Sequence, residues 1–190
     1  DLCEIIQVNT DGVVYRAKNG LKNKIQKAIS EVESITRLEF ESDEYEAFYQ
    51  YAINDYFGVL KGGEIEEKGM FITKTKLGKG LAPVVIPKAI IAYFTQHVPV
   101  EKTVKEDKDI KDFLMSQAVD KKFRVVHGEK PIQRINRFYA STDGAYLFKG
   151  TTLQELSNML TKSGVTILNE FDDLPIENRK INYRYYISEA

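Results

Sequence analysis

One aspartate in the sequence stands where a carboxylate could hold a metal ion. Asp11 belongs to the polar stretch Asn9-Thr10-Asp11-Gly12, which separates two apolar segments at 4–8 and 13–16. Two such segments joined by a tight turn with Gly predict a β-hairpin, and a hairpin tip holds its side chains in a defined position. Carboxylate oxygens are the ligands that Mg²⁺ prefers. Asp11 is therefore a candidate Mg²⁺ ligand, of the kind that catalysis by two metal ions uses.

The same residues also have a purely structural interpretation. Asp-Gly is among the commonest hairpin turns, and turn chemistry alone explains both residues without any catalytic role. The surrounding elements decide between the two interpretations, because a catalytic carboxylate needs a rigid sheet and further functional groups beside it.

The elements nearest the turn predict a sheet with one helix. Apolar residues at helical spacing predict a helix over 20–34, with Asn19 as its cap. Further strands are expected at 38–41, 45–51, 56–60 and 65–72, with a turn at Lys61-Gly62-Gly63.

Composition changes at 73–80, where lysines and glycines replace apolar residues, and this predicts a boundary between domains at 1–75 and 76–190. In the second domain we expect a helix at 83–97, one or two helices in 100–119, strands in 123–149 around a turn at 141–144, a helix at 151–163 and a strand at 181–187. The predicted fold class is α+β, with an antiparallel sheet and a packed helix followed by a mixed, largely helical subdomain.

Four short segments, in this order, resemble family B DNA polymerases. Residues 8–13 resemble the Tyr-Gly-Asp-Thr-Asp-Ser hairpin known as motif C, which takes a similar Asn-Thr-Asp-Gly form in some phage polymerases. Residues 38–41 resemble the next strand of the palm sheet, 54–59 the Lys-Lys-Arg-Tyr-x-Gly segment, and 63–69 the following Lys-Gly strand. The resemblance covers about the first 72 residues and implies a palm subdomain followed by a thumb-like one.

The resemblance also implies roles for single residues. Asp11 matches the second aspartate of the motif and would bind catalytic Mg²⁺. Asn9 stands at the first aspartate, a supporting position, and Thr10 and Gly12 complete the motif, with Gly12 in place of Ser.

Two further positions match residues that approach DNA in the family. Tyr56 matches the Tyr that lies against the primer–template, and Lys68 matches the Lys of the Lys-Gly pair. Asn54 and Asp55 stand where the family has basic residues, so a phosphate contact there is not implied. Tyr56 as a core residue and Lys68 as a solvated strand residue are the structural alternatives.

The family's motif A, which supplies the other metal aspartate, is missing from these residues, as is the helix that grips the incoming nucleotide. We therefore expect the chain, which starts at Asp1, to be a fragment that is inactive alone. In the intact polymerase its partners would be primer–template DNA, deoxynucleoside triphosphates, two Mg²⁺ ions and the N-terminal remainder of the same protein.

Two basic clusters are candidates for phosphate contact. Lys74, Lys76 and Lys79 lie in a Gly-containing loop, and Arg134 and Arg137 stand beside Tyr139. Exposed basic clusters are common, so solvated surface is the alternative for both.

The bulk composition excludes several classes. The sequence has 190 residues and a net charge of -1, which does not suit a protein that coats nucleic acid but allows a local basic groove. A single cysteine, Cys3, fits a reducing compartment, and with two histidines it makes a zinc site a poor prediction. No apolar run is long enough to cross a membrane. We expect a cytoplasmic protein, and the resemblance of the Asn-Thr-Asp-Gly turn to phage polymerases implies a bacterial or phage-infected cell.

Two other functions remain open at this stage. One is a non-catalytic nucleic-acid-binding module with a degenerate palm, which Asn9 favours. The other is an unrelated α+β interaction domain, in which Asp11-Gly12 is only a turn and no basic face lies near it.

Overall fold

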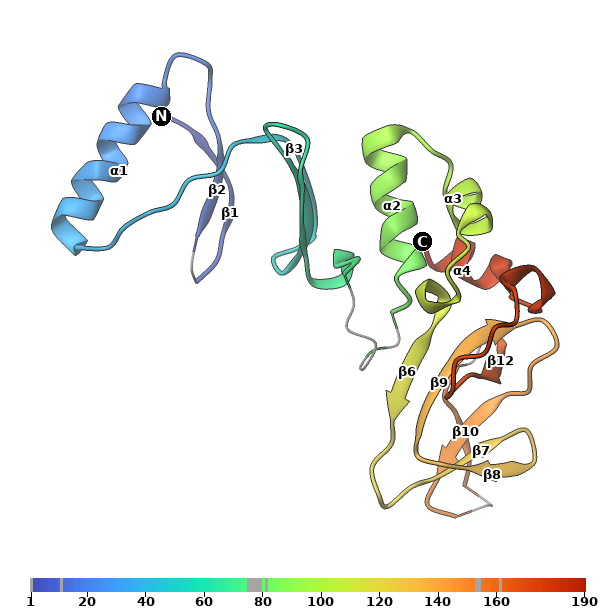
Figure 1. The fold of residues 1–190 in the computed structure, drawn as a ribbon. Coiled ribbons are helices and arrows are strands. Elements are labelled where there is room, and N and C mark those ends of the chain that lie inside the picture. The colour runs from blue at the N-terminus through green and yellow to red at the C-terminus, as the bar shows by residue number, and fades with distance from the viewer. Residues whose placement is uncertain (1, 11, 75–79, 81, 153–154, 161) are drawn as a thin grey trace. The chain divides into compact units, whose positions relative to one another are not determined.

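The computed structural model describes residues 2–10, 12–74, 80, 82–152, 155–160 and 162–190, and the chain divides into two compact units, Asp1–Gly69 and Met70–Ala190 (Figure 1). The division lies close to the boundary expected from composition. Both units combine helices with antiparallel sheets, so the predicted α+β class is confirmed. No helix in the described ranges is long and apolar enough to span a membrane.

In the part of the first unit that the structure describes, there are two small antiparallel sheets and one long helix. Strands β1 (Glu4–Val8) and β2 (Val13–Arg16) pair with each other, and α1 (Lys22–Thr36) follows. The second sheet has the order β3-β4-β5, formed by β3 (Tyr45–Ala52), β4 (Asp55–Leu60) and β5 (Ile65–Lys68). The predicted hairpin, helix and strands at these positions are therefore confirmed.

Two details of this unit differ from the prediction. The expected strand at 38–41 does not form. A side chain near the end of α1 bonds to the backbone there, since Phe40 N donates to Glu33 Oε1 at 2.9 Å. The expected strand at 65–72 stops at Lys68, since Gly69 has a φ of 63° and starts a short 3₁₀ helix, Gly69–Phe71.

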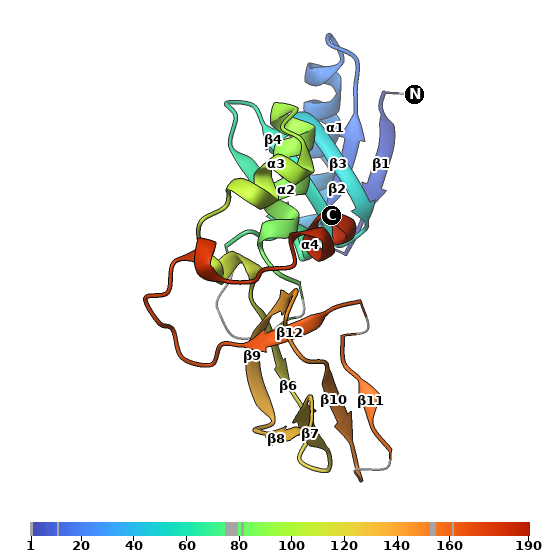
Figure 2. The same ribbon diagram turned by 90° about the vertical axis from the view of Figure 1, so that its right-hand side faces the viewer.

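The described residues of the second unit form two antiparallel sheets and three α-helices (Figures 1 and 2). One sheet has the order β12-β9-β6, formed by β6 (Met115–Ala118), β9 (Ile135–Ser141) and β12 (Gly164–Ile167). The other has the order β11-β10-β7-β8, formed by β7 (Arg124–His127), β8 (Lys130–Ile132), β10 (Leu147–Gly150) and β11 (Ser157–Asn158). The helices are α2 (Val85–Gln96), α3 (Val100–Glu106) and α4 (Tyr183–Glu189), with 3₁₀ turns at Ile110–Phe113 and Ile176–Asn178.

The description of this unit as largely helical is wrong, since sheets make up much of it. Part of 100–119 is strand β6, which pairs with the central strand β9. The described residues of 151–163 form no helix, because Ser157 and Asn158 pair with β10. The tail at 181–187 enters helix α4, not a strand, and Asn182 caps that helix by accepting a hydrogen bond from Tyr185 N.

A tyrosine at the end of the chain joins the elements of this core. The side chain of Tyr186 is fully buried, and its hydroxyl donates to Phe113 O at 2.8 Å and accepts from Ala140 N at 2.7 Å. Helix α4 is thereby bonded to β9 and to the 3₁₀ turn at Ile110–Phe113.

Candidate nucleic-acid interface

The turn between β1 and β2 closes as a hairpin. Val8 pairs with Val13, and Asn9 N donates to Gly12 O at 3.0 Å. Asp11 itself lies outside the described residues, but Asn9 and Gly12 on either side of it are described. A Cβ placed on Gly12 would lie 3.7 Å from Asn9 Oδ1, so the amide oxygen of Asn9 faces the turn. Thr10 is exposed.

A buried glutamine ties this hairpin to the second sheet. Gln7 on β1 is only 5% exposed, and its Nε2 donates to Ile53 O at 2.8 Å. Ile53 lies in the turn between β3 and β4, directly before Asn54 and Asp55. This contact was not predicted; the one signal in the sequence was a polar residue between the apolar residues of a strand.

Two of the segments that resemble polymerase motifs pack directly on each other. Tyr56 on β4 pairs with Lys68 on β5, and Lys68 Nζ lies 5.6 Å from the centre of the Tyr56 ring. Next to this pair, a Cβ on Gly69 would lie 2.1 Å from Asn54 O and 2.2 Å from Asp55 Oδ1. Glycine is therefore required where the Lys-Gly pair meets the turn before Tyr56.

A carboxylate lies among tyrosines on the same sheet. The hydroxyl of Tyr45 donates to Glu66, and burial followed by the contact with Glu66 raises the pKa of Tyr45. Burial and the charge of Glu66 also raise the pKa of Tyr56. Phe48 packs on both tyrosine rings, with centre-to-centre distances of 5.3 Å to Tyr45 and 5.0 Å to Tyr56. Both phenols therefore stay protonated at neutral pH.

This packing changes the role expected for Tyr56. Its side chain is 7% exposed, so the ring offers little surface to a primer–template. Lys68 is half-buried and its ammonium lies over that ring, an arrangement that attracts a cation to the aromatic face. Of the two, Lys68 is the residue that can approach a phosphate, and Tyr56 is the surface on which its side chain rests.

The members of the predicted basic clusters differ in exposure where the structure describes them. Lys74 is exposed, whereas Lys76 and Lys79 lie outside the described residues. Arg134 is exposed, while Arg137 is half-buried and its Nη1 donates to Asn169 O at 3.2 Å. Tyr139 is 4% exposed and belongs to the core of the second unit, which corrects the DNA contact expected of it.

The acidic, histidine and cysteine side chains could in principle form a metal site. Within the part of the chain that the structure describes, no three His, Cys, Asp or Glu side chains converge as a metal site. The oxygen donors at the hairpin turn are the Asn9 amide and, from the sequence, the Asp11 carboxylate, and both are hard donors of the type that Mg²⁺ accepts. Their chemistry is compatible with Mg²⁺, and a complete site would need further ligands.

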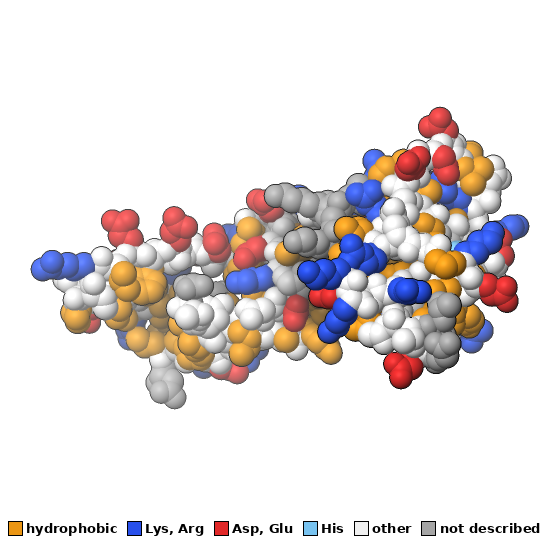
Figure 3. Space-filling model, turned by 90° about the horizontal axis from the view of Figure 1, so that it is seen from below, with side chains coloured by type: hydrophobic (Ala, Val, Ile, Leu, Met, Phe, Trp, Pro, Cys, Tyr) orange, Lys and Arg blue, Asp and Glu red, His pale blue; other side chains and the backbone are white. Residues whose placement is uncertain are grey.

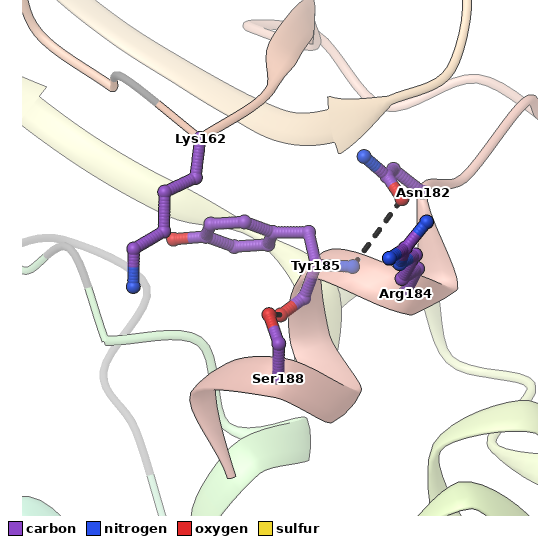
Figure 4. Close-up of a pocket in the computed structure, with 5 residues that line it drawn as sticks. All are labelled: Lys162, Asn182, Arg184, Tyr185 and Ser188. Carbon is purple, nitrogen blue, oxygen red and sulfur yellow. Dashed lines mark hydrogen bonds between the residues drawn. The ribbon is translucent and has the colours of Figure 1, made fainter.

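A polar pocket of about 290 Å³ lies in the second unit beside α4, lined by Lys162, Asn182, Arg184, Tyr185 and Ser188 (Figure 4). Its polar groups are largely engaged in holding the helix in place. Asn182 caps α4 and also donates to Ser163 Oγ at 3.0 Å, and Lys162 forms an ion pair with Glu189. The polar side chains of this pocket therefore belong mainly to the cap of α4.

Comparisons of the chain with models of known families, with curated proteins and with solved structures found no match. What this protein does is therefore inferred from its own residues and from the motifs that they form.

Proposed function

We propose that this chain is the palm and thumb part of a template-directed DNA polymerase of the family B type. In the intact protein it would take part in nucleotidyl transfer with two Mg²⁺ ions, and Asp11 would be one of the metal ligands. The observation that carries the proposal is the connection within the first unit: a closed hairpin turn at 9–12 is bonded through Gln7 to the turn that precedes the Tyr56–Lys68 pair. Motif segments that are far apart in the sequence thus meet in one small unit.

The residues of the chain have separate tasks in this proposal. Two Mg²⁺ ions, when bound, stabilise the attacking and leaving oxygens of the displacement. Asp11 would hold one of them from the hairpin tip, with the Asn9 amide in a supporting position. The bond from Gln7 to Ile53 O ties the hairpin to the turn before β4, and Lys68, whose ammonium lies over the Tyr56 ring, would offer a positive charge to the primer backbone.

The exposed apolar residues of the first unit support the inference that it belongs to a larger palm. Neighbouring residues on β1 and β2 leave apolar side chains exposed on one face of the hairpin, among them Ile5 at 53%, Val8 at 58% and Val13 at 52% exposed. A two-stranded hairpin is marginally stable by itself, and large exposed apolar patches mark interaction sites. We infer that further strands of the same polymerase, including the one with motif A, cover this hairpin.

The proposal is tested with the longer protein that it implies, which contains the polymerase segment preceding this chain. That protein should add deoxynucleotides to a primer–template in Mg²⁺ and stop when EDTA is added. A protein that fails to extend any primer, with its fold intact, contradicts the proposal.

The second candidate is a nucleic-acid-binding module with a degenerate palm, and the observation in its favour is Asn9 at the position of the first aspartate. This candidate predicts that the longer protein binds primer–template DNA but incorporates no nucleotide in Mg²⁺ or Mn²⁺. Either candidate places the protein with DNA in the cytoplasm of a bacterial or phage-infected cell.

A further inference from the structure

The ammonium groups of two lysines lie close to one aromatic ring in the second unit. Lys122 Nζ lies 5.0 Å and Lys149 Nζ 5.8 Å from the centre of the Phe123 ring, which is half-buried. Arg124, the next residue, is exposed. We call these four residues, Lys122, Phe123, Arg124 and Lys149, the Phe123 patch.

The fold builds this patch from a turn and two strands. Asp120 shapes the turn, since its Oδ1 accepts from Lys122 N at 2.9 Å and its carbonyl oxygen accepts from Phe123 N at 2.9 Å. Strand β7 follows, and its Val125 pairs with Lys149 on β10. Phe123 lies directly before β7, and Lys149 reaches its ring from the neighbouring strand.

The positive charges of the Phe123 patch have no acidic partner among the described residues. Other lysines of the same unit form ion pairs with carboxylates: Lys88, Lys105, Lys108 and Lys162. No such pair is found for Lys122, Arg124 or Lys149 within the described parts of the chain.

The surrounding sequence is basic as well. The stretch 120–134 holds five Lys or Arg and two Asp or Glu residues, although the whole chain has a net charge of -1. Figure 3 shows Lys and Arg side chains gathered on the surface of the second unit. Two ammonium groups beside one ring, with no carboxylate paired to them among the described residues, attract an anion.

We propose that the Phe123 patch binds single-stranded nucleic acid. An unpaired base would stack on the Phe123 ring. The neighbouring phosphates would form ion pairs with Lys122, Arg124 and Lys149. Because the ammonium groups of Lys122 and Lys149 form no ion pair among the described residues, they can shift to bind phosphates while a base stacks on the ring in their place. Stacking on aromatic side chains beside basic groups is how proteins bind single strands without reading their sequence. A duplex hides the faces of its bases, so the ring favours a single strand over a double one.

This inference goes beyond the polymerase proposal, because the patch lies in the second unit and requires nothing of Asp11. It is tested by fluorescence anisotropy on the full chain with a labelled oligothymidylate that has no primed end. Phe123→Ala should raise the Kd about tenfold, since one stacked base contributes about that much. The double variant Lys122→Gln/Lys149→Gln should reduce the salt dependence of binding by about 0.7 for each lysine removed.

Matched controls are available in the same unit. Phe171 is 46% exposed and carries one lysine, with Lys111 Nζ 5.5 Å from its ring, so Phe171→Ala removes a similar ring outside the patch. Lys102→Gln/Lys180→Gln removes two exposed lysines elsewhere. We expect both controls to bind the oligothymidylate as the unchanged chain does. The variant Phe123→Tyr, which keeps a stacking ring, should retain binding and thereby separates loss of stacking from loss of fold.

Three results would overturn the inference: absence of oligothymidylate binding by the unchanged chain, equal binding by Phe123→Ala, or displacement by duplex DNA or polyphosphate as effective as by the single strand. The last would mean a general polyanion surface without base stacking. Primer extension is measured on the longer protein and oligothymidylate binding on the Phe123 variants of this chain, so failure of the polymerase proposal and failure of this inference are distinguishable.

Discussion

Removal of the Tyr186 hydroxyl group should measurably lower the stability of the second unit. Tyr186→Phe keeps the ring, which packs edge-on against Phe113 with the centres 5.1 Å apart, but removes the bonds to Phe113 O and Ala140 N. Because Tyr186 is fully buried, both backbone groups are then left unpaired away from water. At about 1 to 2 kcal/mol for each group, the free energy of unfolding of the second unit should fall by about 2–4 kcal/mol.

The assay is hydrogen exchange followed by mass spectrometry, because it reports on β9 and α4 separately from the first unit. Tyr93→Phe is the matched control: Tyr93 is 51% exposed, and its change should cost less than about 0.5 kcal/mol. Equal protection of β9 in Tyr186→Phe and in the unchanged chain would show that the tyrosine does not hold these elements together.

Two further predictions concern a backbone position and a titrating group. Gly69→Ala should lower the free energy of unfolding of the first unit by about 2–4 kcal/mol in urea, since Gly69 has a φ of 63° and a Cβ there would lie 2.1 Å from a backbone oxygen. Its control, Gly63→Ala, has a φ of 88° with open space around it and should show only the smaller cost of backbone strain in the same assay. The N–H of Leu174 and then the guanidinium of Arg179 lower the pKa of Asp172 below its usual 3.8, so the carboxylate stabilises the fold above that pH and loses this contribution as the pH falls through the lowered pKa. Asp172→Asn should therefore be less stable than the unchanged chain at neutral pH and should approach it at strongly acidic pH; a difference that persists in acid would contradict the assignment.

Local patterns predicted the elements that depend on local chemistry. The hairpin at 4–8 and 13–16 follows from two apolar runs around a turn with Gly, and the helices near 20–34 and 83–97 follow from apolar residues at helical spacing. The tail at 181–187 was predicted wrongly, because tyrosines favour strands in general while here Asn182 caps a helix whose Tyr186 reaches a hydrogen-bonded position in the core.

The candidate site was predictable in its parts and not in its connections. The sequence indicated the turn at 9–12 and singled out Tyr56 and Lys68, but it could not show that these two residues pair across neighbouring strands. Nor could it show that Gln7 reaches the backbone of Ile53, since such a contact depends on how two sheets pack and not on spacing along the chain.

The most direct test of the account is the effect of Asp11→Asn on catalysis and on DNA binding, measured separately. In the longer protein, the rate of single-turnover nucleotide incorporation should fall by at least about 10³, because a metal ligand contributes several kcal/mol to the transition state. The Kd for primer–template should change by less than about threefold, a shift of less than 1 kcal/mol, and Asp43→Asn, an exposed aspartate of the same unit, should leave both quantities unchanged. Incorporation by Asp11→Asn at the unchanged rate would contradict the assignment of Asp11 as a catalytic metal ligand.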